Sequence, residues 1–393
     1  MRILFNITFS AILLIGLVGF WALFLNLWKP KKKWPAWVGY IIIIGAWFAA
    51  IRYYILNQVD LYGTMYYPLM NMFRTESYGF LFGVFLAIPV FIILSLLYWI
   101  INKIWSKTPE ENRTGRRAFF RTAATIVPLA TIGGSSYASF AGQQELVVTH
   151  ESFGYTNLPP GLKNYKIVQL SDIHIGPSID LDDFDEILKL ALLQKPNRVV
   201  ITGDLIDKLA WLPQVCERLT TFAKQIPDGV DFILGNHEYH HDVNKVLDAL
   251  KRNTPMNILV NRNIQIMGGK QPVYIAGVAY DNDRKKDNRE AMINKALSGI
   301  PDYAFVILLA HHPEFFEESI ERKIPLTLSG HTHGGQIVFM GMPLVPTGTP
   351  YTKGRYVQEQ SVCYVNNGTG HWFPIRINCP REITVITFFD GVA

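Results

Sequence analysis

The sequence of 393 residues is poor in cysteine, and acidic residues are scarce in its first third. The three cysteines, Cys216, Cys363 and Cys379, form no C-x-x-C pair, which argues against a zinc site built from thiolates. Cys363 and Cys379 lie close together near the C-terminus and would pair only in an oxidising compartment. Their spacing alone does not decide whether they do.

Strong charge of one sign is also missing. Lysine and arginine number 37 and aspartate and glutamate 32, which gives a net charge of +5. The densest basic run, Lys29 and Lys31 to Lys33, adjoins hydrophobic segments, so it does not indicate the basic face with stacking aromatics that a nucleic-acid-binding protein presents. The hydrophobic segments carry almost no ionisable residues, which disfavours a transporter because such residues mark ion pathways.

Hydrophobic residues make up 49% of the sequence and concentrate in its first 140 residues. Segments 3–28, 37–56 and 78–101 are each long enough to cross a bilayer, which takes about 20 mostly apolar residues, and they have Trp and Tyr near their ends. The loops after the first and third segments are basic. The positive-inside rule therefore places both loops in the cytoplasm and the N-terminus outside.

A fourth, mildly apolar segment reads TGRRAFFRTAATIVPLATIGGSSYASFAG. Arg116 and Arg117 resemble a twin-arginine export signal, although they also suit a plain cytoplasmic anchor. Either interpretation exports the chain that follows, whereas a segment lying on the membrane surface would leave that chain in the cytoplasm. The sequence thus predicts a membrane domain over residues 1–142 and a second domain over residues 143–393.

The sequence pattern of the second domain is typical of an α/β protein. Apolar runs typical of strands, such as YKIVQL, RVVI, VDFIL, FVILLA and IPLTLS, alternate with helical patterns such as LDDFDEILKLALLQ and VNKVLDALKR. Each apolar run ends in Asp, Asn or His. The series is Asp172 and His174; Asp204; Asn236 and His237; His311; and His331 and His333.

Side chains at the carboxyl ends of strands can converge in open α/β sheets. Carboxylate, imidazole and amide oxygen together suit borderline to hard divalent metals such as Mn, Fe, Zn or Ni. In LSGHTHGGQI, the two histidines at i and i+2 would face the same side of an extended strand and point to one spot. The pattern therefore predicts a metal centre.

The blocks DIH, GDLID, GNHE, AHHPE and GHTH, in this order, are similar to the calcineurin-like metallophosphoesterase superfamily over about residues 165–390. GHTHGGQ and the preceding hydrophobic segments resemble its bacterial membrane-associated branch. The resemblance implies an α/β fold, a four-layer α/β/β/α sandwich, preceded by transmembrane helices. It also implies a hydrolase with two divalent metal ions.

The resemblance assigns the roles of individual residues. Asp172, His174 and His333 would bind one metal, Asn236, His311 and His331 the other, and Asp204 would bridge both. His237 would stabilise the transition state or protonate the leaving oxygen, or else only orient its neighbours. Late in the chain, Arg355, His371 and Arg376 would contact substrate phosphate or only pack the loops.

The expected function is a membrane-anchored phosphoesterase that hydrolyses a phosphodiester, pyrophosphate or phosphomonoester by a metal-activated hydroxide. Four spans exceed what a tether needs, which favours a phospholipid or other cell-envelope substrate. The expected location is the bacterial cytoplasmic membrane with the catalytic domain on its outer side. A non-catalytic metal-binding scaffold or sensor is the alternative. The residues that bind substrate are not identified by the sequence.

Overall fold

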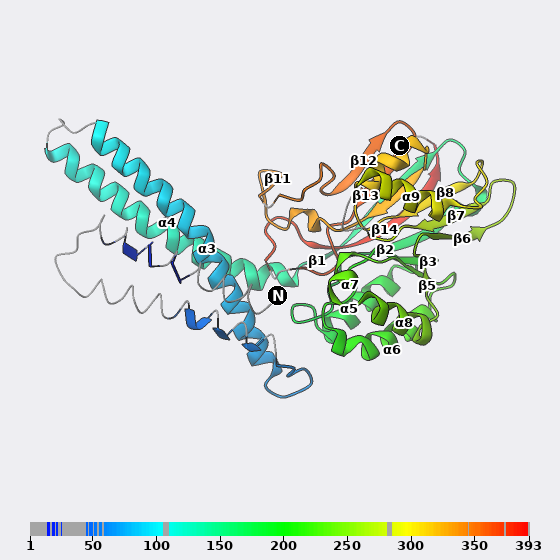
Figure 1. Ribbon diagram of the computed structural model, residues 1–393, viewed down its shortest axis with the longest axis horizontal. Coiled ribbons are helices and arrows are strands. Elements are labelled where there is room, and N and C mark those ends of the chain that lie inside the picture. Colours follow the sequence, from blue (N-terminus) through cyan, green and yellow to red (C-terminus); the bar gives the residue numbers. More distant parts are fainter. Residues whose placement is uncertain are drawn as a thin grey trace. The chain divides into compact units, whose positions relative to one another are not determined.

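The computed structural model divides the chain into two compact units, Met1–Gly142 and Gln143–Ala393 (Figure 1). It describes short scattered stretches before residue 59 and then residues 59–104, 110–280, 285–344, 346–372 and 375–391. More than half of each of the predicted spans 3–28 and 37–56 therefore lies outside the described residues.

Two long helices, α3 (Tyr67–Ile104) and α4 (Glu110–Gln144), form the described part of the first unit. In the part of the chain that the structure describes, one helix, Tyr67–Ile101, is long and apolar enough to cross a membrane. It contains the predicted span 78–101. The fourth predicted segment is helical throughout, as part of α4, but is less apolar.

The helices α3 and α4 pack closely through small residues. A Cβ added to Gly79 would lie 2.8 Å from Ser139, and one added to Gly83 would lie 2.6 Å from the Cα of Ile132. The hydroxyl of Ser135 donates a hydrogen bond to the carbonyl of Gly79 at 2.8 Å. Gly79 contacts Ser139, whereas Gly83, later in α3, contacts Ile132, which is earlier in α4. The two helices therefore form an antiparallel pair.

The second unit contains a first six-stranded sheet in the order β1-β14-β2-β3-β4-β5. β2, β3, β4 and β5 are parallel neighbours, and β14 lies between β1, its parallel partner, and β2, its antiparallel partner. The strands are β1 (Leu146–Tyr155), β2 (Lys166–Leu170), β3 (Arg198–Ile201), β4 (Val230–Phe232), β5 (Asn257–Ile258) and β14 (Arg381–Asp390). The predicted strands at YKIVQL, RVVI and VDFIL correspond to β2, β3 and β4.

A second six-stranded sheet follows the order β12-β13-β9-β8-β7-β6. Its central strands β7, β8, β9 and β13 are parallel, and its two edge strands are antiparallel to their neighbours. The strands are β6 (Arg262–Met267), β7 (Val273–Gly277), β8 (Phe305–Leu309), β9 (Leu326–Ser329), β12 (Gly354–Gln358) and β13 (Ser361–Val365). β8 and β9 are the predicted strands at FVILLA and IPLTLS.

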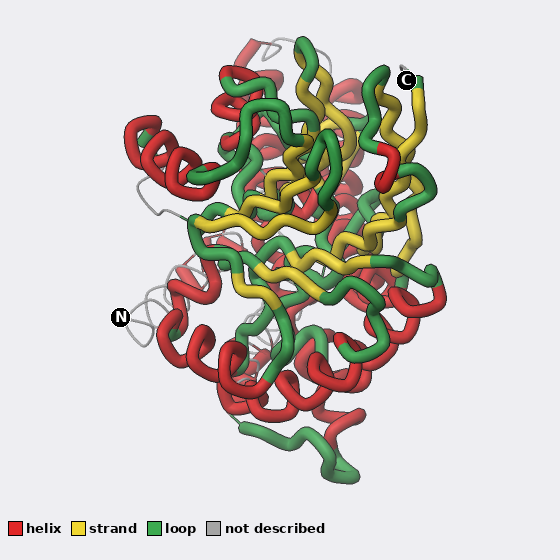
Figure 2. The backbone as a smooth tube through the Cα atoms, turned by 90° about the vertical axis from the view of Figure 1, so that its right-hand side faces the viewer, coloured by secondary structure: helices red, strands yellow, loops and turns green. Residues whose placement is uncertain are grey.

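The main core lies between the two sheets. Ile167 and Val200 of the first sheet belong to one buried apolar cluster with Ile275, Ile307 and Leu328 of the second. Helices cover the outer faces: α5 (Leu181–Leu193), α6 (Leu212–Ala223) and α8 (Val243–Asn253) on the first sheet, and α9 (Lys286–Leu297) and α10 (Phe315–Glu321) on the second (Figures 1 and 2). The α/β/β/α sandwich is confirmed.

Short elements connect these layers. They are the 3-10 turns η1 (Pro160–Leu162), η2 (Leu209–Trp211) and η3 (His333–Gly335), the helix α7 (Asn236–His241), and the hairpin of β10 (Val338–Phe339) and β11 (Met342–Pro343). The three cysteines are buried and free. Cys363 lies on β13 and Cys379 beneath η3, where its Sγ lies 3.4 Å from the carbonyl oxygen of His333.

A buried ion pair joins β3 to β4. Nη1 of Arg198 donates to both carboxylate oxygens of Asp231 at 2.9 Å, and Asn257 of β5 donates to the same carboxylate. Because Arg198→Leu would leave a buried carboxylate without its cation, we expect it to destabilise the fold by about 3–5 kcal/mol. Thermal unfolding of the full chain in detergent measures this effect. The double variant Arg198→Leu with Asp231→Leu should recover most of the lost stability. If the double variant is destabilised as much as Arg198→Leu alone, the explanation is contradicted.

Candidate metal centre

The strand ends bring together all the predicted ligands. Asp172 and His174 follow β2, Asp204 follows β3, Asn236 begins α7 after β4, His311 follows β8, and His331 and His333 follow β9. Both sheets thus contribute predicted ligands to the site. All of these side chains are buried except that of His331, which is half-buried. They form two groups that share Asp204.

The first group consists of Asp172, His174 and His333. Nε2 of His333 lies 3.0 Å from Nε2 of His174. The same nitrogen of His333 lies 3.4 Å from Oδ1 of Asp172. Nδ1 of His174 lies 3.3 Å from Oδ1 of Asp207. A carboxylate on the far nitrogen is the usual outer partner of a metal-binding histidine, because it fixes the tautomer that presents the other nitrogen to the cation.

The second group consists of Asn236, His311 and His331. Oδ1 of Asn236 lies 2.9 Å from Nε2 of His311 and 2.9 Å from Nδ1 of His331. Nδ1 of His311 lies 2.8 Å from the carbonyl oxygen of Thr202, to which it can donate. That hydrogen bond leaves the lone pair of Nε2 directed into the group, as metal binding requires.

Asp204 lies between the two groups. Its Oδ2 is 3.6 Å from Nε2 of His174 in the first group and 3.3 Å from Nε2 of His311 in the second. Oδ1 of Asp204 accepts a hydrogen bond from the backbone N–H of His237 at 2.8 Å. One carboxylate therefore reaches both groups, and the oxygen and imidazole donors are of the kind that binds divalent metal ions.

His331 and His333 do not point to one spot, so the expectation that they converge is wrong. β9 ends at Ser329, and both histidines have left-handed backbone, with φ of 72° and 51°. The alternation of an extended strand therefore does not apply. His331 joins the second group and His333 the first, so that this short turn contributes to both.

Left-handed backbone recurs at Asp172, His174 and Asp204, with φ between 51° and 54°. Each non-glycine residue in this region costs of order 1–3 kcal/mol. Five of the seven predicted ligands thus carry backbone strain, which the surrounding hydrogen bonds must offset. The backbone N–H of His331, for example, donates to both carboxylate oxygens of Asp172 at 3.0 and 3.1 Å.

His237 lies beside the ligands and has a carboxylate partner. Its Nδ1 lies 2.6 Å from Oδ1 of Asp207, and its ring packs edge-on against that of His174. Asp207 also lies 3.5 Å from Nε2 of His241. Asp207 therefore connects His174 to His237.

The pKa values describe the site without metal. Burial lowers the pKa of His311, but the carboxylate of Asp204 outweighs burial and raises it to about 10. Burial, together with the charges of His174 and Arg376, lowers the pKa of His333 well below its usual value. A cation must displace the proton of His311, so metal binding should weaken as the pH falls.

Comparison with known proteins connects this geometry to a family. The model of the calcineurin-like phosphoesterases matches residues 165–335. A metallophosphoesterase of Campylobacter jejuni, itself uncharacterized, is 30% identical over 88% of this chain and 87% of its own. The chain belongs to the calcineurin-like metallophosphoesterases.

Two further metallophosphoesterases extend the comparison. An uncharacterized one of Bacillus subtilis is 32% identical over 70% of this chain and 98% of its own length. A protein of Danio rerio named a transmembrane protein with metallophosphoesterase domain is 27% identical over 82% of this chain and 76% of its own. The alignments with the Campylobacter and Danio proteins are longer than the unit Gln143–Ala393, so the likeness extends into the first unit.

Glu238 fixes the ligand loops of this metallophosphoesterase. Its buried carboxylate accepts hydrogen bonds from the backbone N–H groups of Gly235 at 2.7 Å, Asp204 at 3.0 Å and Leu205 at 2.7 Å. It therefore ties the loop after β3 to the start of α7. The sequence does not reveal this role of Glu238, which depends on hydrogen bonds to the loop after β3.

Gly235 must lack a side chain because Asp204 lies against it. A Cβ added there would lie 2.2 Å from Oδ1 and 2.5 Å from the backbone N of Asp204. Gly235→Ala should therefore displace the shared carboxylate, and a displacement of about 1 Å can cost about 10²-fold in rate. Metal content by mass spectrometry and hydrolysis rate should both fall. Gly268→Ala, which meets nothing closer than 3.6 Å, is the control, and unchanged metal in Gly235→Ala would contradict this packing.

The structure places the three late residues that the sequence offered for phosphate contact or loop packing in different surroundings. Arg376 is buried, and its Nη2 donates to the carbonyl oxygens of Gly370 at 2.7 Å and Asn367 at 2.9 Å. It thereby holds the loop that packs behind His333. Arg355 pairs with Glu151 at 2.7 Å on the surface, and His371 is buried.

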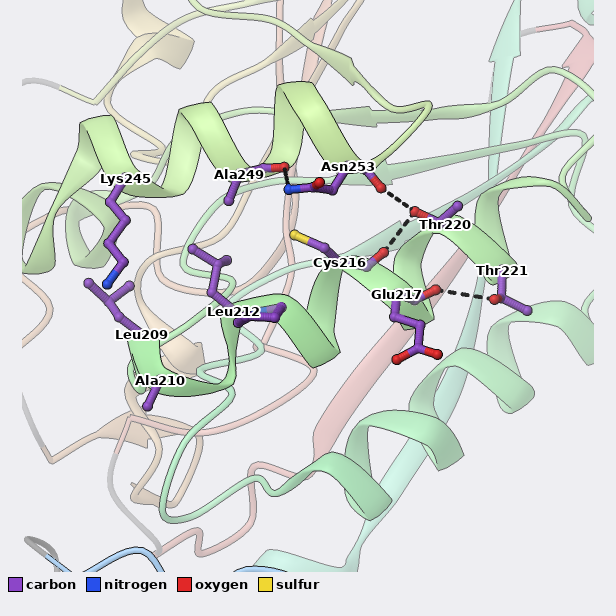
Figure 3. A pocket seen from close by; sticks show the side chains of 11 residues that line it. Leu209, Ala210, Leu212, Cys216, Glu217, Thr220, Thr221, Lys245, Ala249 and Asn253 are labelled. Carbon is purple, nitrogen blue, oxygen red and sulfur yellow. Dashed lines mark hydrogen bonds between the residues drawn. The ribbon is translucent and has the colours of Figure 1, made fainter.

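A groove of about 600 Å³ lies elsewhere, between η2, α6 and α8 (Figure 3). Its lining contains none of the predicted ligands. The hydroxyls of Thr220 and Thr221 donate to helix carbonyls, as does the amide of Asn253. These polar groups are therefore engaged by their own helices, and the groove is separate from the candidate metal centre.

Proposed function

We propose that this protein is a metal-dependent phosphoester hydrolase anchored in a membrane by its first unit. The observation that supports hydrolysis most is the single carboxylate of Asp204, which reaches two complete ligand groups while His237 lies alongside. When bound, a pair of divalent cations supplies the activated water and the positive charge that phosphoester hydrolysis requires. We propose Asp172, His174 and His333 as ligands of one ion, Asn236, His311 and His331 as ligands of the other, and Asp204 as the bridge.

The chain itself supplies the proton. Burial lowers the pKa of His237, but its hydrogen bond with Asp207 and the charge of Asp204 outweigh burial and raise the pKa to about 9. In the site without metal, His237 therefore holds a proton at neutral pH. Asp207 occupies Nδ1, which leaves Nε2 to protonate or hydrogen-bond the leaving oxygen. The alternative of a non-catalytic scaffold requires neither this proton donor nor a full ligand set.

The antiparallel pair of α3 and α4 supports membrane anchoring. Gly79 and Gly83 follow the G-x-x-x-G spacing that lets membrane helices approach closely, and serine hydroxyls bond across such interfaces. This packing suits a membrane position for α4 despite its mild hydropathy. It is also compatible with Arg116 and Arg117 acting as an export signal or as an anchor.

The same pair suggests the side on which the second unit lies. Lys103, Arg113, Arg116 and Arg117 lie toward the end where α3 passes into α4, and basic loops stay in the cytoplasm. The other end of α4, Gln144, is separated from the start of β1 by a single residue. We therefore propose a domain organisation of membrane residues 1–142 and catalytic residues 143–393, with the catalytic unit outside the cytoplasm of a bacterial cell.

The decisive experiment uses the full chain in detergent, stripped of metal and resupplied with Mn²⁺. Hydrolysis of bis-p-nitrophenyl phosphate is compared with that of p-nitrophenyl phosphate. Activity that requires Mn²⁺ and is lost on renewed chelation supports the proposal, and the preferred substrate separates diester from monoester chemistry. If the metal-loaded protein hydrolyses neither of these nor a phospholipid, the scaffold alternative is favoured instead.

A further inference from the structure

The hairpin of β10 and β11 presents large apolar side chains to solvent. Met340 is 83% exposed and Met342 65% exposed, and Phe339 and Leu344 are more than half exposed as well. In Figure 1, β11 stands apart from both six-stranded sheets. Exposed apolar groups gathered at one place mark interaction sites on soluble domains.

The hairpin packs against the turn that carries His333. β10 begins five residues after His333, and a Cβ added to Gly335 would lie 2.4 Å from Cβ of Pro343 on β11. The backbone N–H of Val338 donates to the carbonyl of Ile377 at 3.0 Å. The last glycine of GHTHGG, Gly335, is thus needed because the hairpin packs directly on the turn that carries His333.

The tip of the hairpin is a tight turn. Met340 and Gly341 have φ of 50° and 82°, the two positive values of the turn that best fits a short hairpin. Each strand has only two residues, so the hairpin offers little edge for pairing with another strand. A small preformed apolar tip is better suited to penetrating a surface than to extending a sheet.

The sequence on both sides of the hairpin is free of acidic residues, which suits contact with an anionic surface. No Asp or Glu occurs from Lys323 to Gln358 or from Gln360 to Arg381. Lys353 is exposed. The indole of Trp372, in the loop that carries Arg376, is 57% exposed. Exposed apolar and aromatic side chains at a tip, without acidic residues in the neighbouring sequence, suit an interfacial membrane site.

We propose that the tip Phe339–Leu344 inserts into the surface of an anionic lipid bilayer. The inference rests on the proposed membrane anchoring, because α4 ends one residue before β1 and would keep this unit near the bilayer. Insertion would hold the metal centre at the depth of lipid headgroups. It thereby extends the proposed function to phosphoesters presented at a membrane surface.

The test measures the depth of a label and requires neither hydrolysis nor metal. The full chain carrying Met340→Cys is labelled with an environment-sensitive fluorophore and placed in phosphatidylcholine–phosphatidylglycerol nanodiscs, one chain per disc. The native cysteines are buried, so labelling is selective. The control label is at Leu193→Cys, an equally apolar site at the end of α5 that is 63% exposed.

We expect the label at position 340 to lie about 5–10 Å below the headgroup surface. Its emission should shift to shorter wavelength, and lipids with a shallow spin label should quench it, whereas the label at position 193 should show neither effect. Adding Met342→Glu should reverse the shift and Met342→Leu should preserve it. A label at position 340 that behaves like that at position 193 overturns the proposal, as does shielding that appears only with two chains per disc, which would indicate a contact between copies.

Discussion

Asp204→Asn is expected to abolish most phosphoester hydrolysis and to reduce the bound metal from two ions to one or none. Oδ2 of Asp204 lies within 3.6 Å of His174 and 3.3 Å of His311, so the substitution removes a negative charge from both groups at once. The loss in rate should exceed the roughly 10–100-fold that removing an outer partner of a metal ligand costs. Mn²⁺-dependent hydrolysis and metal analysis of the full chain measure the two effects together.

The fold should survive this substitution. The oxygen of an asparagine amide can still accept the hydrogen bond that the backbone N–H of His237 donates to Oδ1. Asp185→Asn makes the same chemical change on the exposed face of α5, where Asp185 pairs with Arg218, and should leave rate and metal content unchanged. Near-normal turnover with full metal in Asp204→Asn would remove Asp204 from the site.

The sequence predicted the strands whose apolar runs are followed by ligands, since β2, β3, β4, β8 and β9 combine a local pattern with a motif. It did not predict the strand order. β14 is the last strand in the chain, yet it pairs with β1 on one side and β2 on the other. Such pairing depends on contacts between residues more than two hundred positions apart, and no local pattern encodes it.

The sequence likewise predicted only part of the candidate site. Side chains that belong to a motif, such as Asp204 and His311, were identified from their residue type and position. Roles that depend on burial were not. Arg376 reads equally well as a phosphate contact or as a packing residue, and its buried bonds to loop carbonyls decide for packing. The opposite directions of His331 and His333 depend on left-handed backbone, which alternation along a strand does not anticipate.

His237→Ala is expected to lower turnover by about 10²–10⁴-fold, the usual contribution of a general acid, while metal content stays normal. The imidazole of His237 is held by Asp207 and is not among the proposed ligands. Its backbone N–H, which bonds to Asp204, is unaffected by the substitution. Rate and metal content therefore respond differently here, in contrast to Asp204→Asn. A fall in metal content would instead make His237 a ligand.

Asp207→Asn distinguishes proton donation from simple packing by His237. An asparagine retains the shape of the side chain but removes the charge that helps raise the pKa of His237 to about 9. If His237 donates a proton, losing that charge lowers its pKa, so the rate should begin to decline at a lower pH than in the unchanged protein. A leaving group that needs no protonation, p-nitrophenolate, should be less affected than an alkyl alcohol. Equal losses on both leaving groups, with an unshifted pH profile, would reduce His237 to an orienting residue.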